Sequence, residues 1–166
     1  QVKDKMDFFG WYRGPKNSSD SHWALLKDHL SNKENPWTEE MIKSLDLASN
    51  SVVNHLVPPK SARPLSSKGL VLGYIQSGKT ANFSAVIAKA VDEGYKLVVV
   101  LSGMHNNLRL QTQARLHEEI HDLKPESCIT LTRVDEKGDF DKKQSITANR
   151  ALGTKDGFAL VVLKKN

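Results

Sequence analysis

The sequence of 166 residues predicts an α/β fold, in which a parallel sheet is flanked by helices and preceded by a helical segment. Apolar runs of strand length alternate with segments that have helical periodicity, as in a parallel sheet with helical crossovers. A glycine-rich loop separates one such run from the helix that follows it. The first part of the chain has helical spacing only, so we expect an N-terminal helical segment over 1–65 and an α/β domain over 66–166.

Two helices are expected in the N-terminal segment. The first covers 21–31 and opens at Asp20 or Ser21, because short polar side chains can accept the unpaired N–H groups of a first turn. The second begins after Thr38, another capping residue, and continues to the proline pair at 58 and 59.

Four apolar runs are expected to form the parallel sheet. Runs without polar alternation are typical of strands buried on both faces, so we expect 70–72 and 97–101 to be central strands. A helix is expected between these two strands, ended by Gly94 in the left-handed conformation. A polar helix is expected over 108–121, and ligands at the carboxyl ends of the strands. The remaining expected strands are 128–132 and 158–163.

The glycine-rich loop fits the phosphate-binding pattern G-x-x-x-x-G-K-[ST] at every fixed position, from Gly73 to Thr80. Its backbone N–H groups and the N-terminus of the next helix would form an anion site. Lys79 would reach the β- and γ-phosphates, and the Thr80 hydroxyl would ligate Mg²⁺. We therefore predict a P-loop NTPase-like fold that binds ATP and Mg²⁺, although no residue selects adenine over guanine. The expected cradle is Gly73, Gln76, Ser77, Gly78, Lys79, Thr80 and Ala81.

Composition limits the partners and the cellular compartment that we expect for this protein. Charged residues make up 26% of the chain and the net charge is +5, which permits nucleic acid as a partner without requiring it. Cys128 is the single cysteine, so no disulfide forms within the chain and a reducing compartment fits. No apolar run is long enough to cross a membrane, and we expect a cytoplasmic protein. The start at Gln1 and the stop after a strand-like run predict a piece of a longer protein.

Several segments together resemble the Z-one domain family. They are 69–71, the run from Gln76 to Asn82, and the run from Gly103 to Arg115 with its Asn-Asn-Leu-Arg core. Endonuclease activity is ascribed to that family, which is associated with superfamily-two helicase-like ATPases in bacterial DNA restriction or phage defence. The resemblance implies a motor-type fold in which the helix after the second strand contacts the DNA backbone. The residues in that place are Asn106, Asn107, Arg109, Gln111, Gln113 and Arg115, and a merely solvated helix is the alternative.

Hydrolysis of ATP needs an acidic residue at the end of a neighbouring strand, to hold Mg²⁺ and to position the attacking water. The run 97–101 leads into Ser102 and the run 159–163 leads into Lys164, so neither supplies that acid. The resemblance implies that the acid lies beyond the final Lys-Lys-Asn, in the remainder of the same chain. We therefore expect these residues to bind nucleotide without turning it over.

A histidine pair suggests a second kind of site. His117 and His121 fit the pattern H-E-x-x-H, in which two histidines on one helical face bind Zn²⁺ and Glu118 acts as general base. The third ligand is not defined by the sequence, and Glu119 stands where metalloprotease helices carry an apolar residue. The polar end of a surface helix is the interpretation that the sequence favours.

A nuclease signal is weaker still. Asp135 with Lys137, and Asp141 with Lys143, have the spacing of the D/E-x-K half of metal-dependent nuclease sites. Charged loops often contain such triplets, so an endonuclease function depends on the resemblance alone. Two other functions stay open: a nucleotide-dependent phosphotransferase, and a regulatory module in which bound nucleotide only orders the fold.

Overall fold

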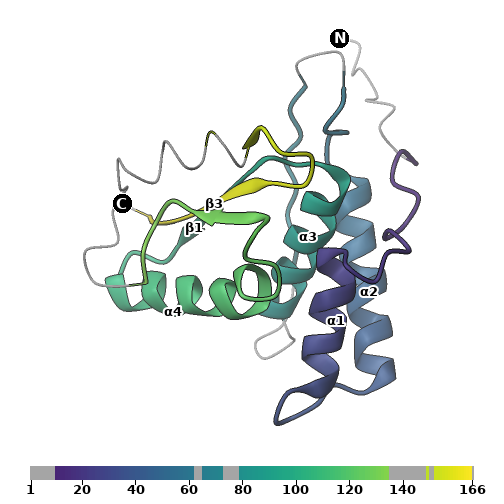
Figure 1. Cartoon of the computed structure of the whole chain (residues 1–166), viewed down its shortest axis with the longest axis horizontal. Helices are drawn as coiled ribbons and strands as arrows, with labels where there is room; N and C mark the ends of the chain where they lie inside the picture. Colours follow the sequence, from purple (N-terminus) through teal and green to yellow (C-terminus); the bar gives the residue numbers. More distant parts are fainter. Residues whose placement is uncertain (1–9, 62–64, 73–78, 135–148, 150–151, 166) are drawn as a thin grey trace.

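The computed structural model describes residues 10–61, 65–72, 79–134, 149 and 152–165 (Figure 1). Within them the strands form one parallel sheet in the order β1-β3-β2. The α/β class, the parallel sheet and the flanking helices are thereby confirmed. The elements in chain order are α1 (His22–Asn32), α2 (Glu39–Asn54), α3 (Lys79–Glu93), β1 (Leu97–Ser102), α4 (Asn106–Leu116), the π-helical turn η1 (His117–His121), β2 (Cys128–Thr130) and β3 (Phe158–Lys164).

The helix ends follow the capping residues of the sequence. The Ser21 hydroxyl accepts a hydrogen bond from the Ala24 N–H at 3.2 Å, and the Thr38 hydroxyl accepts one from the Met41 N–H at 3.3 Å. Gly94 ends α3 with φ 106°, a left-handed conformation that costs glycine nothing because it has no Cβ. The three boundaries predicted from capping residues are therefore confirmed, whereas α2 ends at Asn54, before the proline pair at 58 and 59 that the sequence predicts as its end.

One hydrophobic core joins the N-terminal helices to the sheet. In Figure 1, α1, α2 and α3 lie side by side at one end of the sheet, and α4 runs along the sheet. The same core contains Trp23 and Leu26 of α1, Ala85 of α3, and Leu160 of β3. Residues of α1 and α2 thus share one core with α3 and the sheet. The domain boundary near residue 65 stays a prediction. No helix in the described part of the chain is both long and apolar enough to cross a bilayer.

The run 70–72 does not form a strand. Its residues have no strand pairing, and the side chains of Leu70 and Leu72 are 82% and 84% exposed. The prediction of a buried strand here was therefore wrong. A run of three residues makes few ladder hydrogen bonds, and its burial depends on a neighbouring strand that nothing in the local sequence can supply.

The strand β1 lies at an edge of the described sheet, not at its centre. It pairs with β3 alone, with Val99 opposite Val161, and its side chains alternate between half-buried and exposed. Val98 and Val100 pack on the core, whereas Val99 on the other face is 50% exposed. The expectation of a central strand was wrong for β1, because an apolar run does not reveal its place in the sheet. The central strand is β3, whose Leu160 is fully buried.

The single cysteine of the chain is buried in this core, and its thiol pKa reports that burial. Cys128 begins β2 at 1% exposure, and burial, with a smaller contribution from the charge of Asp122, raises the pKa of its thiol from 9.0 to about 12. The unfolded chain releases this proton first, so the stabilising contribution is complete below pH 9 and is lost as the pH rises toward 12.

We expect wild type to lose stability between pH 8.5 and 10.5 more steeply than Cys128→Ala, by up to about 1.4 kcal/mol per pH unit. The measurement is urea unfolding with a reductant present, at a series of pH values. Equal slopes for the two proteins would show that the thiol ionises readily in the folded state.

Candidate functional site

The predicted phosphate loop is described only at its helical end. Gly73, Gln76, Ser77 and Gly78 lie outside the described residues, whereas Lys79 and Thr80 form the start of α3. The described part of this helix thus starts at the lysine of the phosphate-binding pattern, and the helix follows the glycine-rich loop as the sequence predicts. The first N–H groups of a helix have no partner within it and carry partial positive charge, which favours an anion at this end. Ala81, the next residue along α3, is 1% exposed and lies in the core.

The helix α3 is buried on two sides. Its apolar side chains face the sheet, and its other side packs against α1 and α2. Small residues, Ser84, Ala85 and Ala88, allow this close approach and have no exposed surface. The end of the helix that would receive phosphate is thus built on a rigid element, as binding sites require.

Lys89 is the main polar contact between α3 and α2. Its ammonium group donates to the Asp46 carboxylate at 2.6 Å, to the Ser49 hydroxyl at 2.7 Å and to the side-chain oxygen of Asn50 at 2.6 Å. It also lies 4.1 Å from the centre of the Trp23 ring, within the range of a cation–π contact. The Lys89 side chain has no exposed surface. Burial lowers the pKa of Lys89, and the Asp46 carboxylate opposes that shift.

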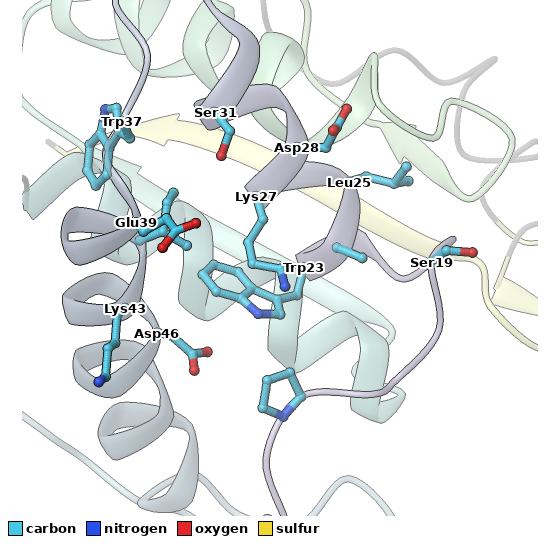
Figure 2. Close-up of a pocket in the computed structure, with 13 residues that line it drawn as sticks. Ser19, Trp23, Leu25, Lys27, Asp28, Ser31, Trp37, Glu39, Lys43 and Asp46 are labelled. Carbon is cyan, nitrogen blue, oxygen red and sulfur yellow. The ribbon is translucent and has the colours of Figure 1, made fainter.

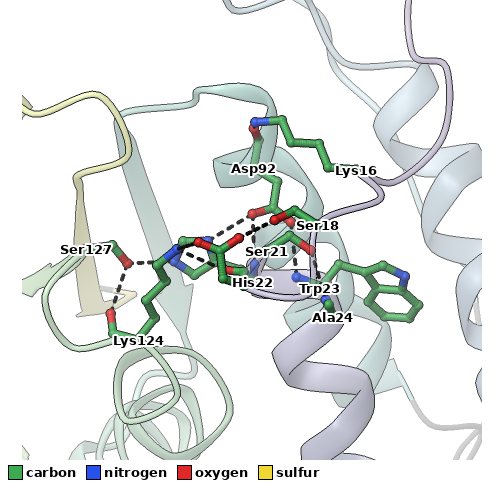
Figure 3. Close-up of polar contacts among 10 residues, drawn as sticks. Lys16, Ser18, Ser21, His22, Trp23, Ala24, Asp92, Lys124 and Ser127 are labelled. Atoms are coloured by element: carbon green, nitrogen blue, oxygen red, sulfur yellow. Dashed lines mark hydrogen bonds and ion pairs between the residues drawn. The ribbon is translucent and has the colours of Figure 1, made fainter.

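Asp92, at the other end of α3, joins three elements (Figure 3). Its carboxylate accepts the backbone N–H of His22 at 2.9 Å and that of Trp23 at 3.1 Å, so it caps α1 from outside the helix. The same carboxylate lies 3.0 Å from Nδ1 of His22, whose Nε2 lies 2.8 Å from the Ser127 hydroxyl. The order Asp92, His22, Ser127 is that of a hydrolase triad.

The surroundings of this triad are those of a structural network. Ser127 is 4% exposed, and its hydroxyl donates to the Lys124 carbonyl at 2.9 Å instead of presenting its proton to His22. A small pocket of about 180 Å³ beside the network is lined by His22 and Asp92, and among the described residues Ser127 does not line it. A nucleophile needs access to a substrate, so we assign the three residues to holding α1, α3 and the start of β2 together.

Sequence reasoning missed these polar contacts. A signal was present, however. Ala85, Lys89 and Asp92 recur at helical spacing on one stripe of α3, and small residues on a second stripe indicate a second packed side.

The carboxyl ends of the two longest strands lie together. Ser102 of β1 is in register with Lys164 of β3, and the Ser102 hydroxyl donates to the Leu163 carbonyl at 3.1 Å. Neither strand ends in a carboxylate, so among the described residues β1 and β3 supply no acid here that could hold Mg²⁺. The acidic pair at 135 and 136 and both D-x-K triplets lie outside the described residues.

The six candidate DNA contacts differ in exposure. Asn106, Asn107 and Gln111 are exposed on α4. Arg109 is 7% exposed and donates to the Arg133 carbonyl at 2.9 Å. The remaining two are Gln113, which is fully buried and accepts the Thr132 hydroxyl proton at 2.6 Å, and Arg115, which is paired with Glu119 at 3.0 Å.

A groove lies between α1 and α2 (Figure 2). Its volume is about 940 Å³, and Trp23 and Trp37 line it together with lysine and carboxylate side chains. Lys33 lies 5.5 Å from the centre of the Trp37 ring, so the aromatic surface is already in contact with a cation of the chain itself. Charges of both signs surround the groove, which gives it no preference for one class of ligand.

Comparison of the chain with family models, with curated proteins and with solved structures found no match. The resemblance to the Z-one domain family therefore stays a prediction. The phosphate-binding pattern and the geometry around α3 are the features of the chain that bear on its function.

Proposed function

We propose that this chain is the ATP-binding part of a helicase-like P-loop ATPase that acts on DNA in the cytoplasm, in bacterial restriction or phage defence. One observation supports it most. The lysine of the G-x-x-x-x-G-K-[ST] pattern lies in a long helix, α3, described from Lys79 onward, which leads into a parallel sheet. A chance match in a glycine turn would have no reason to run directly into a helix that joins a parallel sheet.

The physical role of each part follows from this placement. Bound phosphate would accept the free N–H groups of the first turn of α3, and Lys79 would neutralise its charge. Thr80 would hold Mg²⁺ through its hydroxyl. Lys89 and Asp92 act farther along the same helix by fixing it against α1 and α2. Because the helix is fixed in advance, binding would cost little reordering.

We propose fewer DNA-contacting residues than the six that the sequence predicts. Asn106, Asn107 and Gln111 are exposed, and amide side chains are common donors to phosphate oxygens. Arg109 and Gln113 would have to leave buried hydrogen bonds to reach a ligand. We therefore place the contacts on the exposed amides and on Arg115, with the net charge of +5 as a general attraction.

The first test is thermal unfolding with and without Mg-ATP. At a ligand concentration of 100 times Kd, binding should stabilise the folded chain by about 2.7 kcal/mol. The Lys79→Ala variant should lose this shift, because the phosphate charge is then no longer neutralised. Lys43→Ala is the matched control, since Lys43 is an exposed lysine on α2.

The outcomes distinguish nucleotide binding at the predicted phosphate loop from binding elsewhere on the chain. A shift that Lys43→Ala keeps and Lys79→Ala loses would support the site. An equal shift in both variants would contradict it and indicate binding elsewhere. We also expect no phosphate release by this chain alone, since the ends of β1 and β3 carry no acid.

A further inference from the structure

We propose that His117, His121 and Asp122 bind a divalent transition-metal ion, with Zn²⁺ as the expected occupant. Each of the three residues offers one ligand atom, and these atoms lie within 4.8 Å of one another. Two imidazoles and a carboxylate are ligands that zinc prefers. The site is separate from the phosphate loop, so its test does not depend on nucleotide binding.

The backbone brings the two histidines together. The segment η1 is a π-helical turn, in which the Asp122 N–H donates to the His117 carbonyl at 2.8 Å. The wider turn stacks His121 over His117, with ring centres 4.6 Å apart and ring planes tilted by 34°. Such turns are a costly departure from the α-helix and are frequent at functional sites.

One ring nitrogen of this histidine pair, Nε2 of His117, is buried without a hydrogen-bond partner in the described part of the chain. A buried polar atom without a partner costs about 1–3 kcal/mol. A metal ion would satisfy a nitrogen of this ring, after rotations that close the present spacing of the ligand atoms to the roughly 3.3–3.5 Å found between the ligands of one tetrahedral zinc.

The neighbouring carboxylates suit a cation. Asp122 Oδ1 lies 2.7 Å from Nδ1 of His121, where it orients the ring or turns to ligate the ion itself. Glu118 lies on the same turn, with Oε1 3.5 Å from Nε2 of His29 on α1. Three protein ligands would leave the fourth coordination position of the ion for water. Because the ligands come from η1 and from the residue after it, the ion would also fix the end of the α4–η1 helix to the loop before β2.

The experiment is calorimetric titration of the tag-free chain with ZnCl₂, beside the visible absorption of added Co²⁺. Wild type should bind one ion with a Kd on the order of 1 µM or tighter and give the spectrum of a tetrahedral cobalt site. His117→Ala combined with His121→Ala should abolish both signals. Asp122→Asn should weaken binding about 10–100-fold.

His55→Ala is the matched control, because His55 lies on the surface at the end of α2 and its ring contacts the Ser51 carbonyl there. It should bind zinc like wild type. Circular dichroism of each variant shows whether the fold is kept. Several ions bound per chain, or the same affinity in wild type and the double variant, would overturn the proposal. No binding at 100 µM zinc would do so as well.

Discussion

Replacing Lys89 by methionine is expected to lower the free energy of unfolding by about 3 kcal/mol. Methionine fills a similar volume but removes the ammonium group, which leaves the partially buried Asp46 carboxylate without its cation. The contact with the Trp23 ring is lost with it. The estimate lies at the low end for a broken buried pair, because the Asp46 side chain is 32% exposed and can regain water. Urea unfolding followed by circular dichroism measures the loss.

Lys27→Met provides the comparison for this prediction. Lys27 lies 5.9 Å from the centre of the same Trp23 ring and is only half-buried. Its loss should cost less than about 1 kcal/mol. If both variants lose a similar small amount, then the Lys89 network does not hold α3 to α2 in solution.

Replacing Asp92 by alanine is the second large effect, at about 2–4 kcal/mol. The substitution leaves two buried backbone N–H groups at the start of α1 without an acceptor, and it removes the partner of the His22 ring. Thermal unfolding of the variant should therefore begin at a markedly lower temperature than that of wild type. Removing His22 as well should add less than its separate effect, because both residues belong to one network.

Ser21→Ala separates the contribution of Asp92 from ordinary capping. Ser21 caps the same helix through one hydrogen bond to the Ala24 N–H, and its loss should cost about 1 kcal/mol. An Asp92→Ala variant no less stable than Ser21→Ala would show that Asp92 is only a local cap. It would also remove the reason for treating His22 and Ser127 as part of the structural frame.

The helices could be predicted from sequence because their signals are local. Ser21, Thr38 and Gly94 mark their helix ends through groups a few residues away, and the structure confirms all three. The apolar runs at 97 and 158 likewise indicate strands correctly. What they do not reveal is order in the sheet, which depends on pairing between distant segments.

The polar core escaped prediction for the same reason. Lys89 and Asp92 are normally surface residues, and only the arrival of α1 and α2 on the second side of α3 buries them. The π-helical turn at His117 was also read as ordinary helix, since a one-residue widening leaves no clear trace in periodicity. The phosphate loop is the opposite case, where a strong local pattern predicts a site before its surroundings are known.

The strand order has a consequence for how the chain acquires its shape. The central strand β3 is the last of the described strands in sequence, and it aligns Leu97 with Ala159 and Cys128 with Phe158. Within the described sheet neither earlier strand has a partner until β3 has been synthesised, so the helices can form before these strands pair. During translation three further described elements, α4, η1 and β2, are therefore synthesised before β1 can pair with β3. Closing the sheet thus depends on contacts between segments far apart in the sequence, which form more slowly than the local contacts of a helix.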